Sequence, residues 1–176
     1  MTTEAVVDGF RLTVPVGWWI WKYDNSSFHR NQFQSFAGGC KAVDAVILSD
    51  VGELWLVEVK DYRQHRRTKP GSVFAETATK VRSTLAGLAT ARTAANDAAE
   101  LNLARQAMQC GRVRVALQLV QAAQPSRLFP HVVDPADATQ QLKRVARPVD
   151  PHAVCSAEHI NDPRLPWQTA VSFSTT

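Results

Sequence analysis

The chain has 176 residues, of which 45% are hydrophobic, and its 20 basic and 16 acidic residues give a net charge of +4. This length and apolar content predict one domain, residues 1–176, and exclude a disordered chain. No run approaches the roughly twenty apolar residues of a transmembrane helix, and the first ten residues lack a signal-peptide pattern, so we expect a cytoplasmic protein without membrane contact. Three cysteines at wide spacing, with no CxxC, favour reduced thiols over a disulfide framework or a zinc ribbon.

The N-terminal part of the chain predicts one strand and one short helix. Residues 10–14 alternate between apolar and polar side chains until Pro15 ends the pattern. Three of the five tryptophans then fall within positions 18–21. Because large aromatic side chains dominate protein cores, we interpret this cluster as packing, with base stacking or a partner interface as the alternative. Residues 28–36 predict a short helix whose phenylalanines face inward.

Residues 43–60 predict a β-hairpin. An apolar run at 46–48 is followed by the turn signal Asp50-Val51-Gly52, and residues 54–59 resume a β-branched and aromatic pattern. A three-residue loop that ends in a left-handed glycine would pair Ser49 with Glu53.

The same register, continued away from the turn, brings charged side chains together at the open end of the hairpin. Asp44 falls opposite Glu58, and Lys60 shares the face of Glu58 because strand side chains alternate between faces. Two carboxylates placed opposite each other need a counter-charge, for which Lys60 or a bound divalent cation would serve.

The rest of the chain predicts helices and further strands. Ser72 is a candidate N-cap for a long helix with apolar residues at 74, 78, 81, 85 and 88, and Asp97 to Glu100 resembles a capping box that starts a second helix. Arg112–Val120 alternates like a strand, residues 121–134 form a loop, and 135–147 predict a third helix. Late strands are expected at 152–156 and 167–173. Hairpin, helix and strand together predict an α/β fold, a mixed β-sheet core with flanking helices, whose core spans roughly residues 10–120 and whose C-terminal extension spans roughly 121–176.

Asp44, followed by Glu58-Val59-Lys60 on the next strand, resembles the PD-(D/E)xK signature of restriction-endonuclease-like nucleases. The resemblance implies a restriction-endonuclease-like fold and a Mg²⁺ (or Mn²⁺) ion held by Asp44, Glu58 and the Val59 carbonyl. It implies three catalytic residues, Asp44, Glu58 and Lys60, with Lys60 positioning or polarising the attacking water. Val43 stands where the signature has proline. Many members add an acid from a preceding helix, and the upstream acids here, Glu4, Asp8 and Asp24, include no clear counterpart.

A basic run follows the signature. Residues 60–69 hold five basic residues and one acid, and we expect phosphate contacts from Arg63, Arg66, Arg67 and Lys69. The leading hypothesis is therefore a metal-dependent nuclease that acts on DNA. The alternatives are a catalytically degenerate module of the same fold that binds nucleic acid or a partner protein, and a homo-oligomer or structural subunit of a larger assembly.

Overall fold

The computed structural model describes residues 2–63, 67–122, 124, 127–128 and 131–172. Within them the strands are β1 (Glu4–Val7), β2 (Phe10–Thr13), β3 (Trp19–Trp21), β4 (Ala45–Leu48), β5 (Glu53–Asp61), β6 (Arg112–Val120), β7 (Val154–Ser156) and β8 (Gln168–Val171). The helices are α1 (Val73–Ala94), α2 (Ala98–Ala107) and α3 (Pro135–Ala146), and short helical turns are η1 (Tyr23–Asn25), η2 (His29–Phe33) and η3 (Phe36–Gly38). No described helix has the length and apolar composition needed to cross a bilayer.

The main sheet has five strands in the order β3-β4-β5-β6-β7. Strands β3, β4 and β5 are antiparallel neighbours, whereas β5 pairs with β6 in parallel, and β6 pairs with β7 in parallel. The chain passes from β5 to β6 through α1 and α2, which is the crossover that a parallel pair requires. The predicted α/β class, a mixed sheet with flanking helices, is confirmed.

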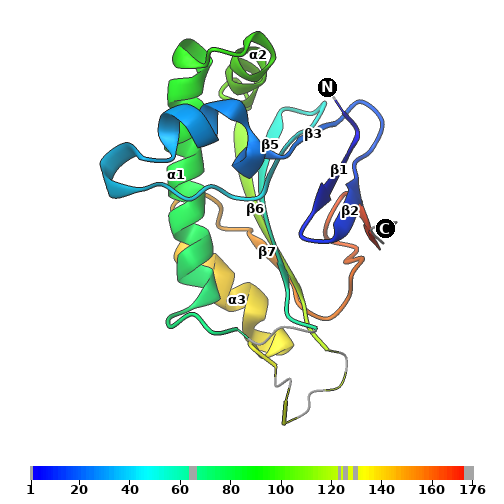
Figure 1. Cartoon of the computed structure of the whole chain (residues 1–176). Helices are drawn as coiled ribbons and strands as arrows, with labels where there is room; N and C mark the ends of the chain where they lie inside the picture. The colour runs from blue at the N-terminus through cyan, green and yellow to red at the C-terminus, as the bar shows by residue number, and fades with distance from the viewer. Residues whose placement is uncertain (1, 64–66, 123, 125–126, 129–130, 173–176) are drawn as a thin grey trace.

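Two layers cover the main sheet. Figure 1 shows α1 running along one face of the sheet, with α3 beside its lower end, and the small sheet β1-β2-β8 on the opposite face. The alternation of side chains along β5 serves both layers: Leu54 and Leu56 pack in the cluster that contains α1, and Trp55 and Val57 pack against the small sheet. Glu58 continues the α1-facing side, so its carboxylate lies inside the molecule.

Caps and apolar spacing place the helices where the sequence predicts them. The Ser72 side chain accepts a hydrogen bond from Phe74 N at 3.2 Å, and the Asp97 side chain accepts one from Glu100 N at 2.9 Å. These two caps satisfy orphan amides at the first turns of α1 and α2. In α1 the buried stripe includes Phe74, Val81 and Leu88, at intervals of seven residues.

Two segments differ from the sequence prediction, whereas the tryptophan cluster packs as interpreted. Phe28 and Phe33 are buried, but Phe36 is 60% exposed, because the chain forms short turns here instead of one helix. Trp19 and Trp21 lie on β3 and pack partly buried against the core, as sheet cover. Strands β7 and β8 both lie after residue 120. Strand β7 joins the main sheet and β8 joins the small one, so this part of the chain contributes to the core, whereas the sequence predicted a C-terminal extension. Phe173, expected in the last strand, lies outside the described residues.

Gly87 of α1 faces the segment that precedes β4. A methyl group at this position would clash with the hydroxyl oxygen of the fully buried Tyr23 and lie 3.3 Å from the Phe33 ring. Alanine favours a helix over glycine by about 1 kcal/mol, but overpacking a core costs about 1 to 3 kcal/mol. We expect Gly87→Ala to lower the free energy of unfolding in urea by about 1 to 2 kcal/mol.

The background variant Tyr23→Phe isolates the clash. The Tyr23 hydroxyl has no hydrogen-bond partner among the described residues, so its removal costs little. Gly87→Ala should then be less harmful in the Tyr23→Phe protein than in the native one. A Gly87→Ala protein as stable as the native one would show that the helix and the Tyr23 segment separate easily.

Candidate active site

The β4–β5 hairpin has the predicted turn and register. Ser49 N donates to Glu53 O at 3.0 Å, and Gly52 closes the loop with a φ of +77°, a conformation that glycine adopts without strain. Ala45 pairs with Val57, so Asp44 and Glu58, one step further out, lie opposite each other.

Two carboxylates and two ammonium groups meet at this end of the hairpin. The Glu58 Oε1 atom lies 2.6 Å from Lys60 Nζ and 2.5 Å from Lys80 Nζ. Asp44 reaches the same two lysines, at 3.8 Å for Lys60 and 3.4 Å for Lys80. Asp44 is 6% exposed and Glu58 1% exposed. The counter-charge that the facing acids need therefore comes from both lysines, and the four charges balance inside the protein.

Backbone contacts fix the Asp44 side of this cluster. Its Oδ2 atom accepts a hydrogen bond from Val59 N at 2.8 Å, and its carbonyl oxygen accepts one from Tyr23 N at 3.1 Å. The carboxylate is thus held against the strand that carries Glu58 and Lys60.

Lys80 belongs to this cluster, although the predicted site residues did not include it. It lies on α1, one position before the buried Val81 and three after the buried Thr77, which places it at the edge of the stripe that faces the sheet. The sequence alone shows that Lys80 borders the apolar stripe of the predicted helix. Its proximity to Glu58, which is 22 residues earlier in the chain, depends on how α1 packs across the sheet, and no local pattern reports it.

The three oxygen atoms expected to bind a metal surround the Lys60 ammonium. Besides its contacts with Glu58 and Asp44, Lys60 Nζ donates to the Val59 carbonyl oxygen at 3.0 Å. The second carboxylate oxygen of Glu58 is buried and has no hydrogen-bond partner among the described residues. These donors are hard oxygen atoms of the kind that Mg²⁺ and Mn²⁺ prefer.

The described residues contain no group of three or more His, Cys, Asp or Glu side chains that could hold a metal ion. An ion at this place would take two carboxylates, one carbonyl and water. Mg²⁺ commonly keeps several water ligands, so the residues present fit such an ion.

Two upstream acids lie in the electrostatic field of the cluster. The Asp8 carboxylate, in the β1–β2 turn, is 3.9 Å from Lys60 Nζ. Burial, and then repulsion by Asp44, raises the pKa of Asp8 and of Asp24, which lies in η1. The Asp24 Oδ1 atom is also buried without a hydrogen-bond partner among the described residues. No role for these acids was predicted from the sequence, and the fold brings both of them toward Asp44.

Burial and neighbouring charges shift the pKa values of the central pair. Burial, followed by repulsion from Asp44, raises the pKa of Glu58 to about 7, against the opposing effect of the two lysines. Burial alone would lower the pKa of Lys60, but the Glu58 and Asp44 carboxylates outweigh it and raise that pKa. Lys60 therefore stays a charged hydrogen-bond donor at neutral pH, and it does not act as a proton acceptor there.

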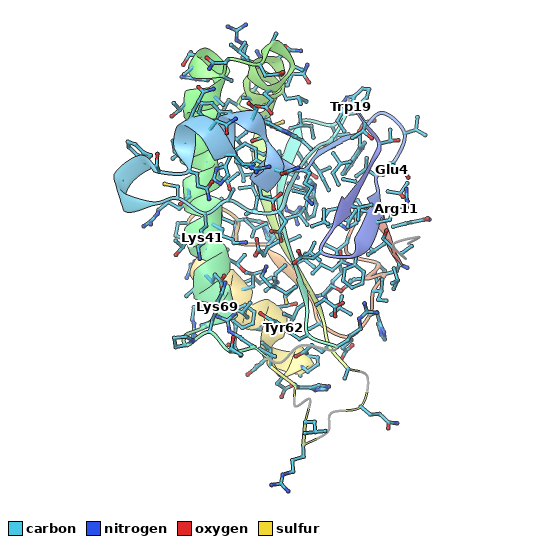
Figure 2. The ribbon with its side chains drawn as sticks, in the orientation of Figure 1. Glu4, Arg11, Trp19, Lys41, Tyr62 and Lys69 are labelled. Carbon is cyan, nitrogen blue, oxygen red and sulfur yellow. The ribbon has the colours of Figure 1, made fainter. Side chains whose placement is uncertain are left out.

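The basic residues that follow β5 lie in two separate places. Arg63 pairs with Asp61 at 2.7 Å, and its guanidinium lies 4.9 Å from the centre of the Phe10 ring in the small sheet. Arg67 and Lys69 both pair with Glu76 near the start of α1, at 3.1 Å and 3.0 Å. Figure 2 shows Lys69 beside α1, on the other side of the molecule from Glu4 and Arg11. Arg66 lies outside the described residues.

A thermal titration tests Asp44 as a metal ligand. A cation at ten times its dissociation constant adds about 1.4 kcal/mol to the stability of the native protein, which raises Tm by roughly 3 to 6 °C for a chain of this size. We expect this Mn²⁺-induced shift in the native protein and less than half of it in Asp44→Asn.

Asp97→Asn is the matched control, because asparagine caps a helix as well as aspartate does and α2 lies outside the charged cluster. It should keep the full shift. Equal shifts in the native protein and Asp44→Asn would remove Asp44 from the proposed ligands.

Comparison with curated proteins finds a distant relative. A cysteine–tRNA ligase of Neisseria meningitidis serogroup A is 28% identical over 158 residues, which is 80% of this chain and 22% of the ligase. The chain thus spans less than a quarter of the length of that protein. No family model and no solved structure matches the chain.

Proposed function

We propose that this protein is a restriction-endonuclease-like, metal-dependent phosphodiesterase that cleaves nucleic acid, with DNA as its first expected substrate. The observation that carries the proposal is the convergence of the Asp44 carboxylate, the Glu58 carboxylate and the Val59 carbonyl on the Lys60 ammonium. Hydrolysis of a phosphodiester needs an activated water and positive charge near the phosphoryl oxygens, and this group of atoms supplies places for both.

Each residue of the candidate active site has a separate part in this proposal. Asp44 and Glu58 would hold Mg²⁺ or Mn²⁺, with the Val59 carbonyl as a third oxygen, and the ion would lower the pKa of a bound water and neutralise the phosphate. When Lys60 leaves the oxygen donors, its charged Nζ is free to orient that water or to contact the phosphate. Lys80 keeps one positive charge beside both carboxylates, which limits their mutual repulsion.

The second candidate function is binding without cleavage. Lys60 and Lys80 already neutralise both carboxylates, and this observation favours a charged cluster that needs no metal. In that case the same face would bind nucleic acid or a partner protein as a catalytically degenerate module. The relative in Neisseria is named for a tRNA substrate, so tRNA belongs among the nucleic acids to be tested.

Incubation with defined substrates decides between the two functions. Supercoiled plasmid, linear duplex, single-stranded DNA and tRNA are each incubated with Mg²⁺, with Mn²⁺ and with EDTA. We expect cleavage of at least one substrate with a divalent ion and none with EDTA. A Glu58→Gln protein purified in parallel controls for contaminating nuclease. Binding without cleavage under every condition would replace the nuclease with the degenerate module.

A further inference from the structure

A basic cavity opens beside the candidate active site. It has a volume of about 640 Å³ and lies between α1, residues 37–41 and residues 67–72. Glu76 is the acid among its lining residues, and the bases that line it are Lys41, Arg67, Lys69, Lys80 and Arg82. Lys80 also contacts Asp44 and Glu58, so the cavity is connected to the charged cluster through this side chain.

Two of these bases have no ion-pair partner within the described part of the chain. Lys41 and Arg82 are exposed, and neither forms an ion pair with any residue that the structure describes. Arg67 and Lys69 share the single carboxylate of Glu76. The cavity therefore has an excess of positive charge, and it attracts an anion with several charges.

An aromatic hollow continues along the same side of α1. The cavity is lined by Thr79 and Ser83 of this helix, and a second hollow of about 460 Å³ is lined by Ala86 and Thr90, the next positions on that helix face. The wall opposite α1 in this hollow consists of Phe28, Gln32, Phe33 and Phe36. The Phe36 ring is exposed and stacks on Phe33, with ring centres 5.4 Å apart.

We propose that one unpaired strand of nucleic acid binds along this face of α1, with its phosphates in the basic cavity and a base stacked on Phe36. A positive groove next to an exposed aromatic ring is the combination that binds single strands without regard to sequence. Ser72 and Ser83, which both line the cavity, are eleven residues apart on or beside α1, about 16 Å along the helix axis. That length accommodates a short run of consecutive phosphates of one unpaired strand.

This inference rests on the proposed function, because the bound strand would be the substrate of the candidate active site. It also changes which bases contact phosphate. Arg67 and Lys69 keep that role, Lys41 and Arg82 are added, and Arg63 is left out because it lies over Phe10 in the small sheet.

Binding measured in EDTA tests the inference apart from catalysis. The probe is a labelled twelve-nucleotide single strand, compared with a blunt duplex of the same sequence by fluorescence anisotropy over a range of salt. We expect the single strand to bind more tightly than the duplex. The double variant Lys41→Glu with Arg82→Glu should weaken single-strand binding at least about tenfold and reduce the salt slope by about one to two units. Phe36→Ala should weaken it roughly tenfold.

Arg92→Glu is the matched control, since Arg92 is also exposed on α1 and lies ten residues from Arg82, about 15 Å along the axis. It should bind within about twofold of the native protein, and all variants should melt near the native temperature. Tighter binding of the duplex, or a double variant that binds as the control does, overturns the inference.

The outcomes separate this inference from the proposed function. A protein that binds the single strand as expected, yet cleaves nothing with Mg²⁺ or Mn²⁺, keeps the binding face and loses the nuclease. A protein that cleaves, but whose double variant binds and cleaves like Arg92→Glu, keeps the nuclease and loses the binding face.

Discussion

Cleavage in the presence of Mn²⁺ should fall at least about a hundredfold in both Glu58→Gln and Lys60→Met, while both proteins stay folded. Glu58→Gln keeps the shape of the side chain but removes the charge of a ligand, and it leaves Lys60 and Lys80 with Asp44 as their shared carboxylate. Lys60→Met keeps most of the volume but removes the charged donor at the point where the three oxygens converge. Cleavage rates at saturating Mn²⁺, with circular dichroism as the check on folding, measure this effect.

Lys143→Met is the control for a lost lysine charge, because Lys143 lies in the last turn of α3, outside the charged cluster. It should cleave at the native rate. Full activity of either site variant, or activity that persists in EDTA, would contradict the proposed roles of Glu58 and Lys60.

The second large effect concerns stability. Lys80→Met should lower the free energy of unfolding at pH 8 by about 2 to 4 kcal/mol, because it leaves two buried carboxylates with Lys60 as their counter-charge. Urea denaturation gives this value directly. Arg82→Met removes a charge two positions further along α1, but Arg82 is exposed and unpaired within the described residues, so this control should change stability by about 0.5 kcal/mol or less.

The stability loss in Lys80→Met should depend on pH. The pKa of Glu58 is raised in the folded protein from its ordinary 4.5 to about 7, so folding takes up a proton between these values and stability decreases as the pH rises through them. Lys80 opposes this rise, and without it the pKa of Glu58 goes higher still. The deficit of Lys80→Met should therefore be smaller at pH 5, where Glu58 is protonated, than at pH 8. A deficit that is equal at both pH values would mean that Glu58 is not the group left uncompensated.

The parts of the fold that the sequence predicted are those with local causes. The turn at residues 50–52 sets the hairpin register, and that register places Asp44 opposite Glu58. Side-chain alternation gives β6 its predicted bounds, Arg112–Val120, and Ser72 caps α1 at the predicted position. Each of these features depends on residues a few positions apart, so single-sequence patterns contain the necessary information.

The parts that it did not predict depend on contacts between distant segments. Lys80 joins the site because α1 packs on the sheet with this residue next to Asp44. Asp8 and Asp24 approach Asp44 from two other segments of the chain, the β1–β2 turn and η1. The pairing of β2 with β8 joins residues more than 150 positions apart. No periodicity or cap specifies such pairs, and the local sequence around Phe36 likewise does not show that this side chain is exposed.

The small sheet also determines how this unit can be joined to other polypeptide. Strand β2 lies between β1 and β8, so the start of β1 at Glu4 and the end of β8 at Val171 are separated by two strand spacings and three residues of rise, about 14 Å. Both strands belong to the small sheet, which Figure 1 shows across the main sheet from α1. Because β1 and β8 are parallel, segments attached at Glu4 and Val171 would start from opposite ends of the small sheet, and both would start across the main sheet from the face with Lys41 and Lys69. A domain whose terminal strands end this close together can be inserted into a surface loop of a longer protein without distorting that loop.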